Sequence, residues 1–362
     1  MNFHLPLLIT VFNGQTNITN LTEVQWDLLI RQARKAMLLA KLYYFVEQRQ
    51  LLGDIPLVVL RHLKSGQVHA EKQFNDLHWE LRHLERIAKK LEYPLVLLKG
   101  AAYVIGGMKA AKGRIFSDID IMVSFDSIAN TEKQLMIQGW VSSNLDAYDQ
   151  RYYREWMHEI PAMYHMFRGS VIDLHHNILP RTVKACPNAD LLLTNARPLS
   201  EYHGISLLAH EDMIIHSATH LFYDGELEHG CRDIMDLNDL LSEFIEEGYS
   251  VNDLVVRANE LGLQKPVYYA LRYVHMILGF PVSDEVINKL NQNIPTGIMI
   301  PIMDFLFIRA LMPDHTSCND RWTGFARWLL YVRSHWLRMP LHQLIPHLLR
   351  KSYRRMLSKE TH

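Results

Sequence analysis

Apolar residues recur at helical spacing along the first ninety residues of the chain. Thr22 and Gln25 match a capping box, and the apolar positions within residues 26–44 predict one long helix after it. The Gly and Pro of segment 53–56 are expected to separate this helix from the next one. A second apolar stripe predicts another helix over residues 68–90. The pattern of this first part is therefore helical.

The pattern changes at Pro94, where short apolar runs replace the long periodic stretches. Residues 94–98 predict a buried strand that leads into a turn. After it we expect a helix over residues 101–110, a strand over 118–123 and a second helix over 127–138. A hairpin is expected next, with strands over residues 163–167 and 171–178. This succession predicts a mixed sheet with helices packed on it.

Helical periodicity returns after about Leu207. The expected helices cover residues 210–223, 232–247, 251–261, 266–278 and 299–311. Together these patterns predict an α+β fold, in which a small mixed β-sheet core is flanked by N- and C-terminal helical regions. We expect an N-terminal helical region over residues 1–90 and a sheet core over residues 91–185. A C-terminal helical domain over residues 186–320 and a basic tail over residues 321–362 should follow.

Composition excludes several classes of protein. Of the 362 residues, 48% are hydrophobic, which excludes global disorder. The net charge of -1 means that any contact with nucleic acid must be local. No apolar run reaches the roughly 18–20 residues of a membrane span, so no transmembrane segment is expected. Cys186, Cys231 and Cys318 are too few and too widely spaced for a disulfide framework or a metal knuckle, which favours a reducing, cytoplasmic location.

Basic residues concentrate at the C-terminal end. Residues 321–362 contain nine Lys or Arg against one acid, Glu360, so this segment carries +8 and the remainder of the chain carries −9. Aromatic residues are interleaved with the bases, at Trp322, Trp328, Tyr331, Trp336 and Tyr353. Three interpretations of the tail stay open: a cationic face of an ordinary helix, a contact with nucleic acid, and docking on an anionic membrane surface.

The strongest chemical pattern lies in the expected strand over residues 118–123. Side chains two residues apart in a strand face the same way, so Asp118 and Asp120 present two carboxylates on one side. Ile119 and Ile121 alternate with them and would be buried on the other side. Mg²⁺ takes oxygen ligands and is commonly shared between a few carboxylates and substrate phosphates. We therefore expect a Mg²⁺ site here, with Mn²⁺ as the alternative ion.

A strand-to-helix turn before this strand extends the pattern. Lys99, Gly100 and Ala101 follow the apolar run, and small residues in such a turn let a phosphate approach the backbone. Lys99 would add a positive charge for a triphosphate. Arg114 and Ser117, just before the two aspartates, are further candidates for contact with the nucleotide.

A third carboxylate follows in the expected hairpin. Asp173, on a neighbouring strand, would complete a two-metal site and act as base toward an attacking hydroxyl. His175 alternates with Asp173 and is a candidate for substrate contact. His220, Arg232 and Asp233, in the later helices, are candidates for the same role, and ordinary helix packing is the alternative for His220.

This combination resembles the nucleotidyltransferase superfamily of DNA polymerase beta. Within it, the chain is most similar to a little-characterised bacterial family that has a Lys-Gly turn and an Arg-x-x-Ser-Asp-Ile-Asp strand. The resemblance spans about residues 20–240. It implies that the three aspartates hold Mg²⁺ and that the Lys-Gly turn lies at the phosphates of an NTP.

The residues and the resemblance together predict an enzyme that transfers NMP from an NTP to an acceptor hydroxyl, with release of pyrophosphate. RNA, a protein side chain, a saccharide and a small molecule all remain open as the acceptor. One alternative is a metal-dependent glycosyltransferase, which would use the Asp-x-Asp motif but would not need Asp173. The other is a non-catalytic nucleotide-binding module, against which the presence of all three carboxylates argues.

Overall fold

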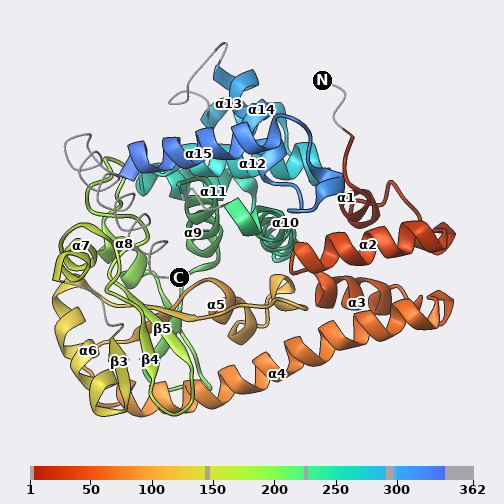
Figure 1. The fold of residues 1–362 in the computed structure, drawn as a ribbon. Coiled ribbons are helices and arrows are strands. Elements are labelled where there is room, and N and C mark those ends of the chain that lie inside the picture. The colour runs from red at the N-terminus through yellow and green to blue at the C-terminus, as the bar shows by residue number, and fades with distance from the viewer. Residues whose placement is uncertain (1–3, 143–146, 224–226, 291–296, 298, 339–362) are drawn as a thin grey trace, which may run out of the picture.

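A mixed β-sheet forms the middle of the molecule (Figure 1). The computed structural model describes residues 4–142, 147–223, 227–290, 297 and 299–338. The strands in this part of the chain are β1 (Leu95–Leu97), β2 (Ile119–Met122), β3 (Trp140–Ser142), β4 (Met163–His165), β5 (Val171–His175), β6 (Arg197–Pro198) and β7 (Ile205–Leu207). Their order across the sheet is β3-β4-β5-β2-β1-β7-β6. The pairs β2–β5 and β1–β7 are parallel and the other pairs are antiparallel.

The N-terminal part is helical, as predicted. Its helices are α1 (Leu7–Phe12), α2 (Glu23–Lys35), α3 (Leu39–Gln48) and α4 (Leu57–Ala88). The capping box is confirmed, because the Thr22 side chain accepts from the Gln25 amide and the Gln25 side chain accepts from the Thr22 amide. The single helix predicted over residues 26–44 is wrong. The amide of Leu38 donates to the Ala33 carbonyl and Met37 takes a φ of 56°, which ends α2 before α3 begins.

Short helices connect the strands of the sheet. They are α5 (Lys99–Ile105), α6 (Ile128–Ile137), α7 (Ala147–Trp156) and α8 (Ala189–Thr194). The predicted helix over residues 127–138 is confirmed by α6, and the predicted hairpin is confirmed by β4 and β5, which pair Met163 with Ile172. The predicted helix 101–110 is only partly correct: α5 begins two residues earlier, with Lys99 and Gly100 in its first turn, and ends at Ile105, and a separate 3-10 turn follows at Lys109–Ala111.

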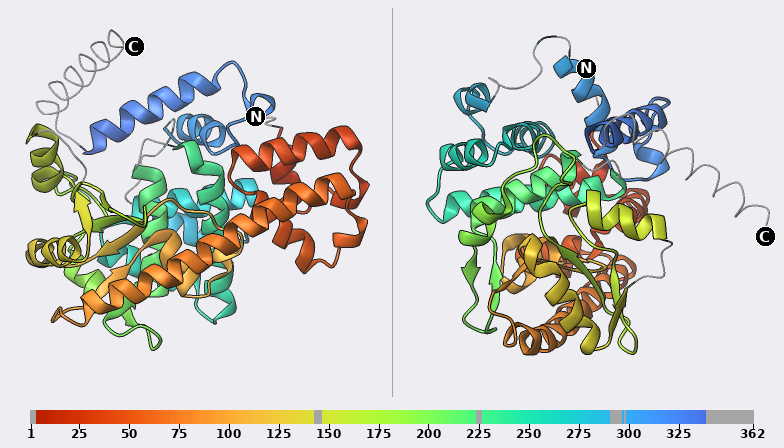
Figure 2. Two further views of the ribbon diagram at one scale, coloured as in Figure 1. Left: turned by 60° about the horizontal axis from the view of Figure 1, so that its bottom comes forward. Right: turned by 90° about the vertical axis from the view of Figure 1, so that its left-hand side faces the viewer.

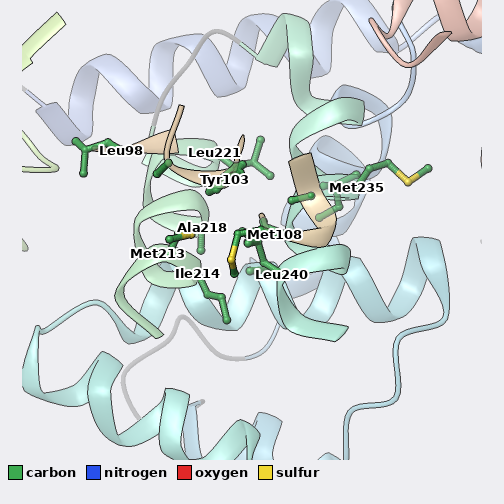
Figure 3. Close-up of a cluster of buried hydrophobic side chains, with 14 of the residues drawn as sticks. Leu98, Tyr103, Met108, Met213, Ile214, Ala218, Leu221, Met235 and Leu240 are labelled. Atoms are coloured by element: carbon green, nitrogen blue, oxygen red, sulfur yellow. The ribbon is translucent and has the colours of Figure 1, made fainter. Parts of the chain in front are cut away.

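The C-terminal helices pack together on the side of the molecule opposite to α4, with α5 between them (Figures 1 and 2). They are α9 (His210–Tyr223), α10 (Gly230–Glu246), α11 (Val251–Glu260), α12 (Gln264–Leu278), α13 (Asp284–Leu290), α14 (Met299–Ala310) and α15 (Thr323–Arg338). The core between α5, α9 and α10 is apolar, with Tyr103, Ala218 and Leu240 among its buried residues (Figure 3). Helix α9 is buried on nearly all sides, so the later helices surround it.

The α+β fold with a mixed sheet and helical flanks is confirmed. The sequence patterns did not indicate β3, α7, α8, β6 or β7. The short β7 is fully buried and pairs in parallel with β1, so its position depends on a distant partner rather than on a local pattern. Across the described ranges, no helix is long and apolar enough to cross a membrane.

Candidate active site

Two adjacent parallel strands carry two of the three predicted aspartates. The register of β2 and β5 places Asp120 directly beside Asp173. Neighbouring strands lie about 4.8 Å apart and paired residues point to the same face of the sheet. Asp118 lies in the bend just before β2, close enough for its charge to act on both Asp173 and Lys99. The structure thus brings together carboxylates that are about fifty residues apart in the chain.

Asp120 is buried and is held by two cationic partners. Lys99 Nζ lies 2.8 Å from Asp120 Oδ1, and His175 Nε2 lies 2.9 Å from the same oxygen. Burial by itself would raise the pKa of Asp120, but the charge of Lys99 and the hydrogen bond from His175 hold that pKa well below its usual range. Asp120 is therefore ionised at neutral pH.

Lys99 reaches Asp120 from a strained position. It is the first residue of α5 and has a φ of 47°, a conformation that costs a side-chain-bearing residue about 1 kcal/mol or more. Next to it, the amide of Leu98 donates to the main-chain carbonyl of Asp120 at 3.0 Å. The strained turn therefore aims the ammonium group back at the carboxylate of the neighbouring strand.

Glu159 is a fourth carboxylate in this group, which the sequence analysis missed. It forms an isolated β-bridge with His175, and its Oε2 lies 3.5 Å from His175 Nε2. Ligand atoms of His158, Glu159 and His175 all lie within 4.8 Å of one another, close enough to share a metal ion. Glu159 sits in an irregular segment between α7 and β4, so no periodic pattern marks it.

Negative charge exceeds positive charge in this cluster. Burial, together with the charges of Glu159 and Asp120, raises the pKa of Asp173 to about 7. Burial would lower the pKa of His175, but the hydrogen bond to Asp120 and the charge of Glu159 raise it above its ordinary value. Four carboxylates thus face two cationic groups, Lys99 and His175. Carboxylates outnumber the cationic groups by two, and oxygen donors whose mutual repulsion raises the pKa of Asp173 are the chemistry that fits a divalent cation.

Neutral histidines line the surroundings of the cluster. Burial and the nearby charge of His175 hold the pKa of His158 well below its ordinary value, and burial and the charge of Lys99 do the same for His216 on α9. His220 lies one turn further along α9 and is close enough to influence both histidines. The structure therefore places the predicted His220 beside this site, together with His216 and His158.

The other predicted polar residues belong to a second ionic cluster. Arg114 is buried, with its Nε 2.5 Å from Asp236 Oδ2 and its Nη2 3.6 Å from Asp233 Oδ1. Arg232 pairs with Asp233 at 2.9 Å. Lys41, from α3, lies 2.6 Å from Asp239 Oδ2 and 3.5 Å from Asp236 Oδ1. Arg114, Arg232 and Asp233 therefore belong to ion pairs that connect α10 with α3 and with the segment before β2.

The remaining predicted residues surround the start of α5 and β2. Gly100 and Ala101 are buried. A Cβ on Gly100 would lie 3.0 Å from the Cβ of Phe116. The glycine therefore lets the first turn of α5 approach the segment before β2 closely. Ser117 is exposed. With Asp118 it borders a hollow of about 450 Å³ between α4 and the β4–β5 hairpin. This hollow gives room for a ligand beside Asp118.

Comparison with known proteins identifies the family of the chain. No curated protein and no solved structure matches the chain. A family model described as an uncharacterised nucleotidyltransferase matches residues 22–279, a range that runs from α2 to α12 and contains every aspartate of the cluster. A match over more than half of the chain shows membership, so the chain belongs to this family of nucleotidyltransferases.

Proposed function

We propose that the cluster around Asp118, Asp120 and Asp173 transfers NMP from an NTP to an acceptor hydroxyl, with release of pyrophosphate. The observation that carries this proposal is the register of β2 and β5, which sets Asp120 beside Asp173 on one face of the sheet. Nucleotidyl transfer is the activity class of the family. Metal-dependent nucleotidyl transfer needs several carboxylates close together, because they bind the metal ions that hold the phosphates.

The same aspartates are the proposed ligands of Mg²⁺, or of Mn²⁺ in its place. When bound, such an ion neutralises charge on the triphosphate and on the leaving pyrophosphate. Asp118 and Asp120 supply carboxylate oxygens, and Glu159 lies close enough to His175 to join the donor set. Lys99 keeps Asp120 ionised before substrate binds. Its ammonium has three donors and a side chain that is 22% exposed, so it is also the proposed phosphate contact.

Asp173 is the proposed base. Its pKa of about 7 belongs to the cation-free cluster, and a bound cation would lower it, so that the carboxylate is ionised and ready to accept a proton. The acceptor oxygen forms a bond to the α-phosphorus while its proton passes to the Asp173 carboxylate, and the bond from the α-phosphorus to the bridging oxygen of pyrophosphate breaks. The proposed place for the acceptor is the hollow beside Asp118, which Asp118 and the first residue of β2, Ile119, border.

The proposed compartment is the cytoplasm, where NTP is available. The small number and wide spacing of Cys186, Cys231 and Cys318 support a reducing compartment.

Label transfer from the four NTPs tests this proposal. Each NTP carries ³²P at the α-phosphorus and is incubated with protein, Mg²⁺ and a bacterial lysate, and products are sorted by nuclease and protease sensitivity. Asp118→Asn should reduce the transfer by at least about 10²-fold, because one oxygen donor of the cluster becomes an amide. Asp126→Asn is the matched control, since Asp126 is an exposed aspartate just after β2, and it should retain activity.

Two outcomes would contradict the proposal. Equal label with wild-type protein and Asp118→Asn would remove the aspartates from the reaction. Transfer from labelled sugar nucleotides, with none from any NTP, would assign the cluster to a glycosyltransferase instead.

A further inference from the structure

Helix α15 has apolar side chains on both of its long faces. Its inner face packs against α14 and α9 and buries Thr323, Ala326, Leu330 and Ser334. Its outer face, with the residue just before the helix, presents Trp322, Phe325, Trp328, Val332 and Trp336, which are between 41% and 62% exposed. These positions recur every three or four residues, so they form one stripe along the helix.

The aromatic rings of this outer stripe form a continuous row. The Phe325 ring lies 6.2 Å from the Trp322 ring and 6.2 Å from the Trp328 ring. Phe305 of α14 extends the row, with its ring 6.3 Å from that of Trp322. Figure 2, left, shows α15 at the outer edge of the molecule, drawn in blue. A contiguous apolar surface of this kind marks an interaction site rather than scattered exposed residues.

The sequence of α15 and of the residues after it is rich in basic side chains. Residues 321–338 contain four Arg and no Asp or Glu, and five more Lys or Arg follow in residues 339–362, which lie outside the described residues. The rest of the chain carries −9. An aromatic stripe is therefore joined in sequence to a strongly basic segment on an otherwise acidic protein.

We propose that the outer face of α15 docks on the surface of a bilayer that contains anionic lipid. Trp and Phe side chains favour the interface between headgroups and acyl chains, and Lys and Arg near it are attracted by anionic headgroups. Nucleic acid would favour basic side chains interleaved with the stacking rings, whereas the exposed stripe itself carries only Trp, Phe and Val, which suit burial at a lipid interface.

Vesicle flotation with the full-length protein tests this proposal. Wild-type protein should float with vesicles of mixed phosphatidylcholine and phosphatidylglycerol, less so at high salt, and should stay unbound with phosphatidylcholine alone. The double substitution Trp328→Ala/Trp336→Ala should weaken partition by about tenfold or more, because two interfacial anchors are lost. Met136→Ala/Ile137→Ala is the matched control: both side chains are exposed on α6, and their removal should leave flotation unchanged.

Folding of the variants is checked by circular dichroism and thermal unfolding, which should match wild type since the replaced side chains are exposed. Failure of wild-type protein to float with anionic vesicles would overturn the proposal, as would equal flotation of the double variant. The wild-type protein could fail to float and instead bind single-stranded RNA or self-associate. If the double substitution abolished that binding, the face would belong to another partner. None of these outcomes bears on nucleotidyl transfer, which rests on other residues.

Discussion

Two clusters of charged side chains lie within this protein, and their charges are balanced differently. The cluster that joins α3, α10 and the segment before β2 has three cationic and three acidic members, Lys41, Arg114, Arg232, Asp233, Asp236 and Asp239. The cluster on β2 and β5 has four carboxylates and two cationic groups, Lys99 and His175.

This difference in charge balance indicates which cluster stabilises the fold and which one binds a ligand. A buried set of charges that neutralises itself fixes how elements pack, and loss of one member leaves its partner unpaired. A set with an excess of negative charge costs stability in the empty protein, and a divalent cation would relieve that cost. We therefore assign packing to the first cluster and nucleotidyl transfer to the second.

The largest expected effect on stability is in the balanced cluster. Arg114→Met should lower the free energy of unfolding by about 3–5 kcal/mol, because Asp236 and Asp233 lose a buried partner. Chemical denaturation measures the change. The control is Arg151→Met, which removes an exposed i,i+4 pair with Glu155 and should cost no more than about 0.5 kcal/mol. Equal effects of the two substitutions would mean that the buried cluster contributes no more to packing than an exposed ion pair does.

A smaller effect of opposite sign is expected at Asp173. Its pKa rises from 3.8 to about 7 on folding, so the folded state holds the proton more tightly and stability is lost as pH rises from about 4 to about 7. Asp173→Asn should remove this loss and stabilise the metal-free protein at pH 8 by up to about 4 kcal/mol, the free energy that corresponds to this rise in pKa, with little gain at pH 4. Denaturation curves in EDTA at the two pH values measure the gain. A variant that is destabilised at pH 8 would show that the carboxylate is not under repulsion.

The smallest effect is the response to Mg²⁺ itself. At about ten times its dissociation constant, Mg²⁺ should stabilise wild-type protein by about 1.4 kcal/mol, seen as a rise in melting temperature. Asp118→Asn should lose most of this rise, whereas Arg151→Met should keep it. A rise of the same size in all three proteins would mean that Mg²⁺ binds elsewhere.

Local patterns in the sequence predicted the elements that depend on nearby residues. The capping box at Thr22 and the helix over residues 210–223 are satisfied within a few turns of chain, and both are present. The continuous helix over residues 26–44 failed because one residue, Met37, adopts a left-handed conformation that helical periodicity does not reveal. The strand β7 was missed because its pairing with β1 spans more than a hundred residues.

The candidate site was predicted in the same partial way. Asp118 and Asp120 were identifiable because a strand with their spacing would put them on one side, and the β2–β5 register brings Asp173 beside Asp120. Glu159 carries no spacing signal and reaches the site only through an irregular segment that bridges to His175. The ion pair between Arg114 and Asp236 likewise joins residues more than a hundred positions apart, which no local pattern indicates.

The most direct measurement is the uptake of Mn²⁺, followed by the paramagnetic resonance of the free ion. We predict that wild-type protein removes Mn²⁺ from solution at one or more saturable sites, and that Asp118→Asn/Asp173→Asn protein, folded by circular dichroism, does not. Equal uptake by the two proteins would contradict a cation site formed by the carboxylates of β2 and β5.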